Sequence, residues 1–198
     1  KRIGVDGVRY EEIFITDYET DIPGLYDCLG EYESIDELNY LATLLGDMDS
    51  GELDLFGAAV EHGDHTGSLR ELINLAQNLD CYDFYPGVRD NDDLGRIYIE
   101  EMDALEVPEN VLPYFDFEAY GRDVAIEENG VFTKGGYVVA TGGFTEVYSG
   151  RDDLPDESRI FAYPKLNIRE QMAAYKEVID KNADKPDKTH TAVSHEER

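Results

Sequence analysis

Negative charge is concentrated in one long stretch of this chain, and that concentration limits both how the stretch can fold and which partners it can bind. Residues 10–133 contain 32 Asp and Glu residues against four arginines, so they account for the whole net charge of −28. Residues 1–9 and 134–198 balance, with 13 acidic and 13 basic residues. Like charges on a compact body repel one another and lower its stability. Such a surface therefore indicates a strongly cationic partner.

The composition is nonetheless that of a folded protein. Hydrophobic residues make up 41% of the 198 residues, and Tyr and Phe together number 22, which favours a packed core in one domain or two small ones. Cys28 and Cys81 fit no metal-binding spacing and are expected to be reduced thiols. No signal peptide and no run of 18 apolar residues is found, so we expect a cytoplasmic protein that does not bind membranes.

Local patterns in the first half of the chain predict one strand and three helices. Residues 9–18 are rich in aromatic and β-branched residues, as in a strand. A helix is predicted from Ser34 to about residue 46, a second over 53–61, and a third from Ser68. Ser34 and Ser68 are each followed three residues later by Glu, the spacing of a capping box.

The second half predicts a strand over 82–85, a helix over 92–102 and a β-meander through 123–126, 131–133 and 137–140. Taken together, the patterns predict an α+β fold, with sheets at both ends of a helical centre.

Several short blocks of sequence, in a fixed order, carry a family resemblance. They are residues 10–19 (YEEIFITDYE), 31–39 (EYESIDELN), 82–88 (YDFYPGV), 94–101 (LGRIYIEE), 107–109 (VPE) and 115–123 (FDFEAYGRD). With these blocks the chain resembles the ArdA antirestriction family over about residues 8–140. The FDFEAYGRD block, followed by the FT and GYV strands, is the most specific of them.

The resemblance implies an elongated chain of small domains, in which mixed sheet-plus-helix domains flank a helical middle domain. Residues 1–50 would form the N-terminal α+β domain, lacking the family's first strand and helix. Residues 51–87 would form the central helical domain, and 88–149 the C-terminal α+β domain that makes the homodimer contact. Residues 150–198 lie beyond the resemblance, and we expect an appendage with one helix, starting near Asn167, and a disordered tail.

The resemblance also implies a function. Proteins of this family are encoded on mobile elements such as conjugative transposons and are antirestriction proteins. They mimic B-form DNA and occupy the DNA-binding channel of type I restriction-modification enzymes, formed by methyltransferase and specificity subunits, and so protect incoming DNA. The chain is then expected to be an inhibitor and not an enzyme, with no cofactor, no metal and no catalytic residues.

A mimic of DNA needs carboxylates at roughly the spacing of phosphates. Residues four apart on a helix rise by about 6 Å and residues two apart on a strand by about 6.6 Å, against about 3.4 Å per nucleotide of one DNA strand. At about one charge per 1.7 Å of duplex, 28 charges match about 48 Å of DNA, and a dimer matches about 95 Å.

Two rows of acids are expected to supply these charges. The first acidic row is Asp36, Glu37, Asp47, Asp49, Glu52, Asp54, Glu61, Asp64 and Glu71. The second acidic row is Asp90, Asp92, Asp93, Glu100, Glu101, Asp103, Glu106, Glu109, Asp116 and Glu118. The Lys and Arg side chains that normally meet phosphates would pair with these carboxylates, so binding should weaken as salt rises.

Other interpretations of the acidity are less favoured. Adaptation of the whole surface to high salt would also deplete cations after residue 133, where ten Lys and Arg occur. Residues 90–101 resemble a calcium loop, but Leu94 stands where an oxygen ligand is required. His62 and His65, three apart in a polar segment, are more typical of solvated side chains than of a metal site.

No catalytic motif is found, and the sign of the charge disfavours binding to nucleic acid itself. The alternative that stays open is an acidic protein that binds another basic partner, such as a nucleoid protein or a different nuclease.

Overall fold

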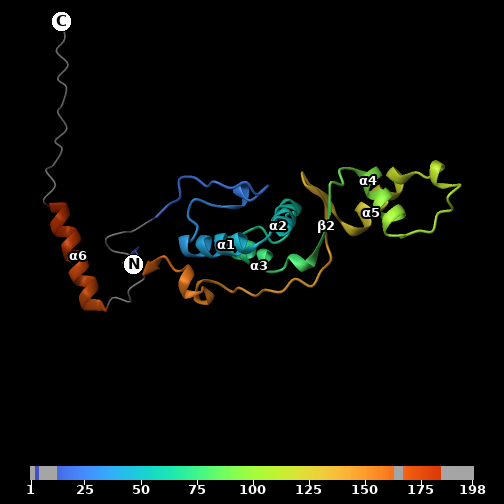
Figure 1. Cartoon of the computed structure of the whole chain (residues 1–198). Coiled ribbons are helices and arrows are strands. Elements are labelled where there is room, and N and C mark those ends of the chain that lie inside the picture. Colours follow the sequence, from blue (N-terminus) through green and yellow to red (C-terminus); the bar gives the residue numbers. More distant parts are fainter. Residues whose placement is uncertain (1–2, 5–12, 163–166, 184–198) are drawn as a thin grey trace, which may run out of the picture. The chain divides into compact units, whose positions relative to one another are not determined.

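The computed structural model describes residues 3–4, 13–162 and 167–183 (Figure 1). The chain divides into two compact units, one of Phe14–Ile160 and one of Lys1–Ile13 with Phe161–Arg198. The described residues contain six α-helices, a three-stranded sheet and a two-stranded sheet. The predicted α+β fold class is therefore confirmed, and each unit is taken by itself below.

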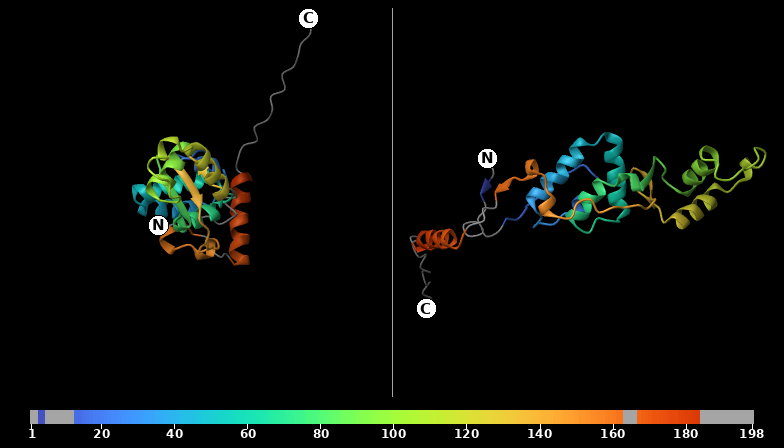
Figure 2. Two further views of the ribbon diagram at one scale, coloured as in Figure 1. Left: turned by 90° about the vertical axis from the view of Figure 1, so that its right-hand side faces the viewer. Right: turned by 90° about the horizontal axis from the view of Figure 1, so that it is seen from below.

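In the Phe14–Ile160 unit the three-stranded sheet lies between two groups of helices (Figures 1 and 2). The buried side chains form two cores, called the first and the second core, one on each side of the sheet. The antiparallel order of the sheet is β2 (Tyr82–Pro86), β4 (Gly136–Ala140), β3 (Val131–Phe132). Successive side chains of a strand point to opposite faces, so Val138 is buried in the first core whereas Tyr137 and Val139 are buried in the second. The predicted arrangement of sheets around a helical centre is therefore not confirmed.

Three helices lie on the first side of the sheet: α1 (Ile35–Asp47), α2 (Ser50–His62) and α3 (Leu69–Ala76). Helix α2 packs on the sheet, and α1 packs on α3. All three predicted helices are thus confirmed. The side chains of Ser34 and Ser68 accept the expected hydrogen bonds from Glu37 and Glu71 backbone N–H groups. Helix α2 starts earlier than predicted because Asp49 and Glu52 form a complete capping box that the sequence analysis did not identify.

Two buried asparagines, Asn74 in α3 and Asn78 just after it, bind the segment that follows β4 through hydrogen bonds. Asn74 Oδ1 accepts hydrogen bonds from the backbone N–H groups of Val147 (2.7 Å) and Tyr148 (2.8 Å), and its Nδ2 donates to the Tyr148 carbonyl. Asn78 bonds both backbone groups of Thr145. Backbone groups of an irregular segment need partners when they are buried, and these two amides supply them.

Helices α4 (Asn91–Arg96) and α5 (Phe117–Glu128) cover the second face, and α4 continues as a π-helical turn, η3 (Ile97–Glu101). The predicted helix over 92–102 is confirmed, but the predicted strand over 123–126 is wrong. Residues 123–126 continue α5, in which Phe117 and Gly121 are buried and Val124 is half-buried on the core side. Packing of this helical face outweighs the weak strand preference of β-branched residues.

The strand predicted over 9–18 is also wrong for residues 13–18, which have no regular structure, while residues 9–12 lie outside the described part. Ile13 and Phe14 are exposed, and the segment is held by hydrogen bonds from Ile15 N–H to the Glu31 carbonyl and from the Tyr18 hydroxyl to the Gly30 carbonyl. The predicted strands over 82–85, 131–133 and 137–140 are confirmed as β2, β3 and β4. Short 3₁₀ turns fill the connections at η1 (Tyr26–Cys28), η2 (Leu79–Cys81) and η4 (Leu112–Tyr114).

Residues 150–160 pack with the first core. This segment contains two 3₁₀ turns, η5 (Arg151–Asp153) and η6 (Asp156–Ser158), and lies beside α1. Leu154 and Ser158 are buried there. Asn39 of α1 donates a hydrogen bond of 3.0 Å to the Ser158 carbonyl. The domain boundaries at 50/51, 87/88 and 149/150 stay predictions.

In the other unit, β1 (Ile3–Gly4) pairs in parallel with β5 (Phe161–Ala162), and α6 (Ile168–Ala183) follows. Asn167 and Glu170 form a capping box at the start of α6, which confirms the predicted helix. The disorder predicted over residues 180–198 is wrong for residues 180–183, which continue α6, while residues 184–198 lie outside the described part. None of the helices described is long and apolar enough to cross a lipid bilayer.

Candidate functional site

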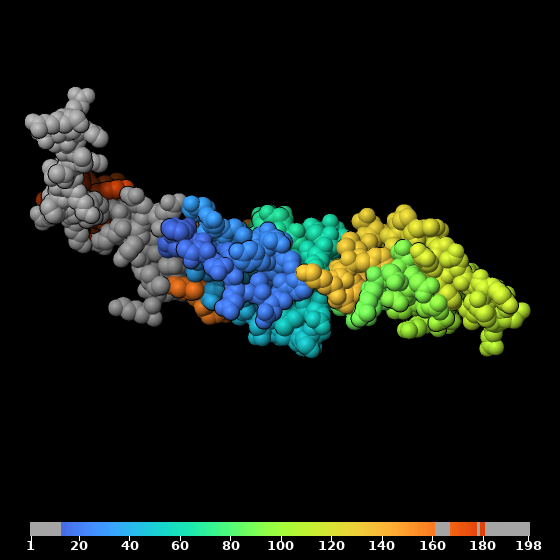
Figure 3. All heavy atoms as spheres, turned by 90° about the horizontal axis from the view of Figure 1, so that it is seen from above, coloured from blue at the N-terminus to red at the C-terminus, as the bar shows by residue number. Residues whose placement is uncertain are grey.

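Most of the first acidic row is exposed on α1, α2 and the loops beside them, which run from blue to teal in Figure 3. The exposed members are Asp47, Asp49, Glu52, Asp54 and Asp64. Glu61 and Glu71 are partly covered and also hold the fold together. Glu61 accepts a hydrogen bond from Lys134 N–H, and Glu71 accepts one of 2.7 Å from Gly67 N–H.

Asp36 and Glu37 do not belong to an exposed row, and this corrects the sequence prediction. Asp36 is only 2% exposed and accepts a hydrogen bond of 2.6 Å from Ile160 N–H. The Glu37 side chain is 13% exposed, accepts a hydrogen bond of 2.8 Å from the Tyr148 hydroxyl and lies 3.3 Å from Arg151 Nε. Burial, followed by the hydrogen bond to Glu37, raises the pKa of Tyr148. Both carboxylates stabilise the packing of residues 148–160 on α1.

The second acidic row is more uniformly open to solvent. Its members lie on α4, on η3, on the loop that follows and at the start of α5. Eight of the ten are exposed, and Asp92 and Asp93 are half-exposed; the exposed ones are Asp90, Glu100, Glu101, Asp103, Glu106, Glu109, Asp116 and Glu118. The segment that carries them runs from green to yellow-green in Figure 3.

Close contact between α4 and α5 places the acids of these two helices beside each other. A Cβ atom on Gly95 would lie 2.1 Å from the Phe117 carbonyl oxygen, and one on Gly121 would lie 2.0 Å from the Asn91 carbonyl oxygen. Glycine is therefore required at both positions, since any side chain would push the helices apart. Both glycines lie in blocks that carry the family resemblance, LGRIYIEE and FDFEAYGRD.

Helix caps fix the direction of several carboxylates. Asp49, Asp90 and Asp116 are the N-cap residues of α2, α4 and α5, and each accepts a hydrogen bond of 2.8–3.0 Å from a backbone N–H group of its helix. Side chains held in this way lose little conformational entropy when they meet a cation. The capped start of α4 at Asp90 also accounts for the loop that resembled a calcium site.

One arginine partly neutralises the second acidic row. Arg96 Nε lies 2.7 Å from Asp92 Oδ2, and Arg96 Nη1 lies 3.6 Å from Glu100 Oε1. The guanidinium carbon is also 4.4 Å from the centre of the Phe117 ring. Arg96 thus joins α4 to the start of α5 and reduces the net charge available from Asp92 and Glu100.

Sequence reasoning missed a further set of exposed acids. They lie between the segments that were chosen for their helical spacing, on residues 17–31, around β2 and late in α5. These acids are Asp17, Glu19, Asp21, Asp27, Glu31, Asp80, Asp83, Asp123 and Glu127. The absence of Lys and Arg between residues 10 and 69 could have pointed to the first five of them.

Of the two histidines expected to be solvated, His65 is exposed but His62 is not. The ring of His62 is buried, with 3% of the side chain exposed, and its Nδ1 lies 3.5 Å from Asp64 Oδ2. It packs edge-on against Tyr82, whereas His65 stacks on Phe144 with a ring separation of 3.6 Å. Among the described residues, no group of three or more His, Cys, Asp and Glu side chains is placed to hold a metal ion. Cys28 and Cys81 are free thiols, and burial raises the pKa of both.

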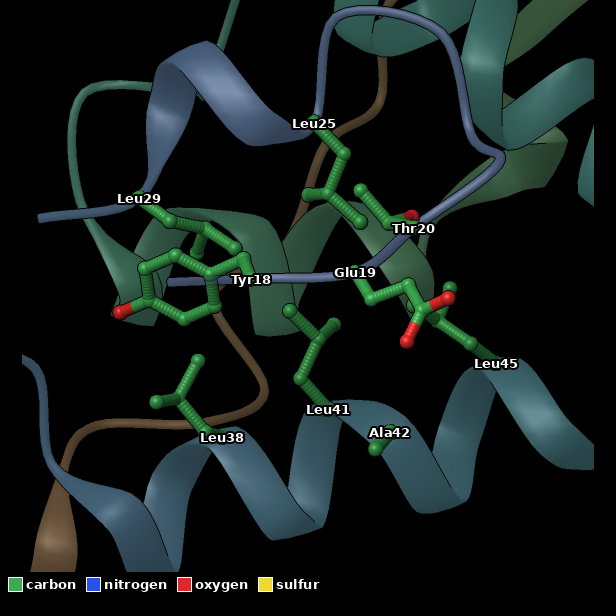
Figure 4. A pocket seen from close by; sticks show the side chains of 9 residues that line it. All are labelled: Tyr18, Glu19, Thr20, Leu25, Leu29, Leu38, Leu41, Ala42 and Leu45. Carbon is green, nitrogen blue, oxygen red and sulfur yellow. The ribbon is translucent and has the colours of Figure 1, made fainter. Parts of the chain in front are cut away.

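An apolar pocket of about 250 Å³ lies between residues 18–29 and α1 (Figure 4). Six aliphatic side chains form most of its wall: Leu25, Leu29, Leu38, Leu41, Ala42 and Leu45. Glu19 contributes the one carboxylate of the lining, and the Tyr18 hydroxyl donates a hydrogen bond to the Gly30 carbonyl. A lining of this kind does not provide the paired carboxylates of general acid–base catalysis.

Fold and surface together define an acidic α+β protein whose exposed carboxylates are its main chemical feature. The chain matches the family model described as antirestriction protein (ArdA) over residues 1–139, and it belongs to this family. The resemblance stated from the sequence is therefore confirmed, and the family is one of antirestriction proteins. A search among curated proteins gave no match to the chain.

Proposed function

We propose that the chain inhibits type I restriction-modification enzymes as a mimic of B-form DNA. Its carboxylates would take the places of phosphates in the DNA-binding channel formed by the methyltransferase and specificity subunits. Incoming mobile DNA, such as that of a conjugative transposon, would then escape cleavage in the cytoplasm. Membership of the antirestriction family gives the biological process, and the charge pattern suggests how it is carried out.

The observation that carries the proposal is the exposure of the second acidic row. Eight carboxylates within residues 90–118 are open to solvent, on two helices whose backbones are in contact and on the loop that joins them. Carboxylates in such an array attract the Lys and Arg side chains that line a DNA channel, and mutual repulsion within the array is relieved when those cations bind. Inhibition in this scheme is occupation of a site, so it requires no catalytic step, cofactor or metal.

We further propose that the active form is a homodimer joined through the segment 88–149. Large apolar side chains are exposed in this part of the chain and would be covered by a second copy: Met102, Leu105, Val111, Tyr114 and Ile126. Tyr114 is 87% exposed, and large exposed apolar groups are often part of interaction surfaces. Tyr114→Asp should therefore weaken the dimer, which sedimentation velocity would detect as a larger monomer fraction at a given concentration.

The proposal is tested by competition for the enzyme. The purified chain is titrated into a type I methyltransferase bound to a labelled duplex, and displacement of the DNA is followed at 50 mM and 200 mM salt. We expect stoichiometric displacement that weakens as salt rises, because exposed charge pairs are screened. Absence of displacement at both salt concentrations would overturn the proposal and leave an acidic protein with another basic partner as the interpretation to test.

A block of substitutions tests whether binding depends on the second acidic row or only on the net charge of the chain. The block neutralises four carboxylates that are not helix N-caps: Glu101→Gln, Asp103→Asn, Glu106→Gln and Glu109→Gln. Exposed ion pairs contribute about 0.2–1 kcal/mol each, so the block of four should weaken competition by about fourfold or more.

The matched control removes the same number of charges after residue 150, outside both acidic rows: Asp152→Asn, Glu157→Gln, Glu177→Gln and Asp180→Asn. It should leave competition within about twofold of the unaltered chain, because none of these four carboxylates belongs to the rows proposed to contact the enzyme. Equal losses in block and control would mean that net charge alone, and not the second acidic row, governs binding.

A further inference from the structure

Helix α6 exposes a single stripe of large apolar side chains. Ile168, Met172, Tyr175 and Ile179 are each between 55% and 78% exposed. On the opposite side of the helix, Ala174 is buried. The stripe is thus the uncovered side of α6, and exposed apolar groups arranged in this way indicate an interaction surface.

The spacing of the stripe identifies the kind of partner. Its residues are separated by four, three and four positions, which is the a/d pattern of a heptad with Met172 and Ile179 at a and Ile168 and Tyr175 at d. A strict a/d stripe is narrow and matches the seam of a coiled coil, whereas a helix that packs on a globular core has a wider apolar face. The surface therefore fits another helix.

The charge of α6 points to a second copy of this chain as that partner. Residues 168–183 contain three basic and three acidic residues, so the helix is neutral in a chain of net charge −28. Two copies of so anionic a chain repel one another at most surfaces, and α6 adds nothing to this repulsion. A helix that lies on a membrane would instead carry an excess of Lys and Arg on its polar face.

The residues beside the stripe favour a parallel pair. Arg169 and Lys176 occupy e positions, and Gln171 occupies a g position. In a parallel pair, Lys176 faces Gln171 of the other copy, an uncharged neighbour that can accept a hydrogen bond. In an antiparallel pair, the e positions of the two copies face each other and bring cations together, which is destabilising.

We propose that α6 forms a parallel two-helix coiled coil with α6 of a second copy, as a self-association surface separate from the acidic rows. The seam spans two heptads, so the contact is weak by itself and adds to any other contact between the two copies through effective concentration. This inference does not depend on mimicry of DNA.

Sedimentation velocity of the full chain over a range of concentrations tests the association. The measurement is made in the Tyr114→Asp background, which weakens the other proposed dimer contact. Met172→Glu places a charge in the seam, whereas Ala173→Glu adds the same charge one residue away, at an exposed position outside it. We expect Met172→Glu to weaken association at least tenfold and Ala173→Glu to change it less than twofold, with α6 helicity unchanged by circular dichroism.

Disulfide trapping tests the orientation. In a parallel pair, residue 168 lies against residue 168 of the other copy, so Ile168→Cys chains should form interchain disulfides under mild oxidation. Ala173→Cys chains should not, and both variants keep Cys28 and Cys81 as a common background. The proposal is overturned if the Tyr114→Asp chain shows no self-association at any concentration, if the two glutamate variants weaken it equally, or if the two cysteine variants crosslink alike.

Discussion

A Cβ atom on Gly121 would lie 2.6 Å from the backbone nitrogen of Gly95, so α4 and α5 cross with their backbones in contact at these two residues. The crossing fixes the position of Asp116 and Glu118 relative to the acids of α4. It also explains why the LGRIYIEE and FDFEAYGRD blocks each contain a glycine within a helix, where glycine is otherwise unfavourable.

Gly121→Ala should destabilise the protein by about 1–3 kcal/mol or more, because the added methyl group overlaps backbone atoms that cannot move aside. Urea denaturation followed by circular dichroism measures the loss. Gly46→Ala in α1 is the matched control, since nothing lies within 4 Å of a Cβ atom there. That substitution should instead stabilise the protein by about 0.5–1 kcal/mol, and equal effects at the two sites would contradict the proposed crossing.

Alkaline pH should unfold the protein through its buried tyrosines. Burial raises the pKa of Tyr82 and Tyr137 to about 12, with nearby carboxylates of Asp64 and Glu128 as the next causes. Below pH 10 both phenols are neutral in the folded and unfolded states. Between pH 10 and about 12 the unfolded chain loses these protons first, so the free energy of unfolding falls as pH rises.

Urea denaturation at several pH values between 8 and 11.5 measures this fall. The double variant Tyr82→Phe/Tyr137→Phe should show a smaller decrease above pH 10. Tyr114→Phe, which alters an exposed phenol, should keep the decrease of the unaltered chain. If the double variant and the unaltered chain fall in parallel, other groups control alkaline unfolding.

The cap residues allow charge to be removed without loss of the helix. Asn caps helices about as well as Asp, whereas Ala does not. Asp90→Asn should therefore change the free energy of unfolding by less than about 0.5 kcal/mol, and Asp90→Ala should lower it by about 1 kcal/mol. If both variants compete with DNA equally poorly, the carboxylate charge matters for binding; if only Asp90→Ala is impaired, the cap matters through the fold.

Asn74 should be among the residues least tolerant of substitution in the first core. Asn74→Leu leaves the N–H groups of Val147 and Tyr148 and the Tyr148 carbonyl without their partner, and a buried polar group left unpaired costs about 1–3 kcal/mol. We expect a loss of at least 3 kcal/mol by urea denaturation. Asn39→Leu, which removes one hydrogen bond to the Ser158 carbonyl, should cost about 1 kcal/mol, and a similar cost at both sites would contradict the role assigned to Asn74.

The sequence by itself determined the features that depend on neighbouring residues. The location of the charge, the helices that follow Ser34, Ser68 and Asn167, and the strand 82–85 could all be predicted, because a cap or an alternating pattern acts within a few residues. The blocks of the family resemblance were likewise visible in the sequence, and the family match bears them out.

Tertiary structure alone decided which acids stay exposed and how residues 123–126 fold. Asp36 is buried by a partner 124 positions away, and Glu37 by Tyr148, 111 positions away. The positions of Asp36 and Glu37 in α1 predicted surface side chains, because a local sequence pattern carries no information about contacts with such distant residues. Residues 123–126 became helical because Gly121 allows α5 to lie against α4, so packing between distant segments outweighed a local preference of a few tenths of a kcal/mol per residue.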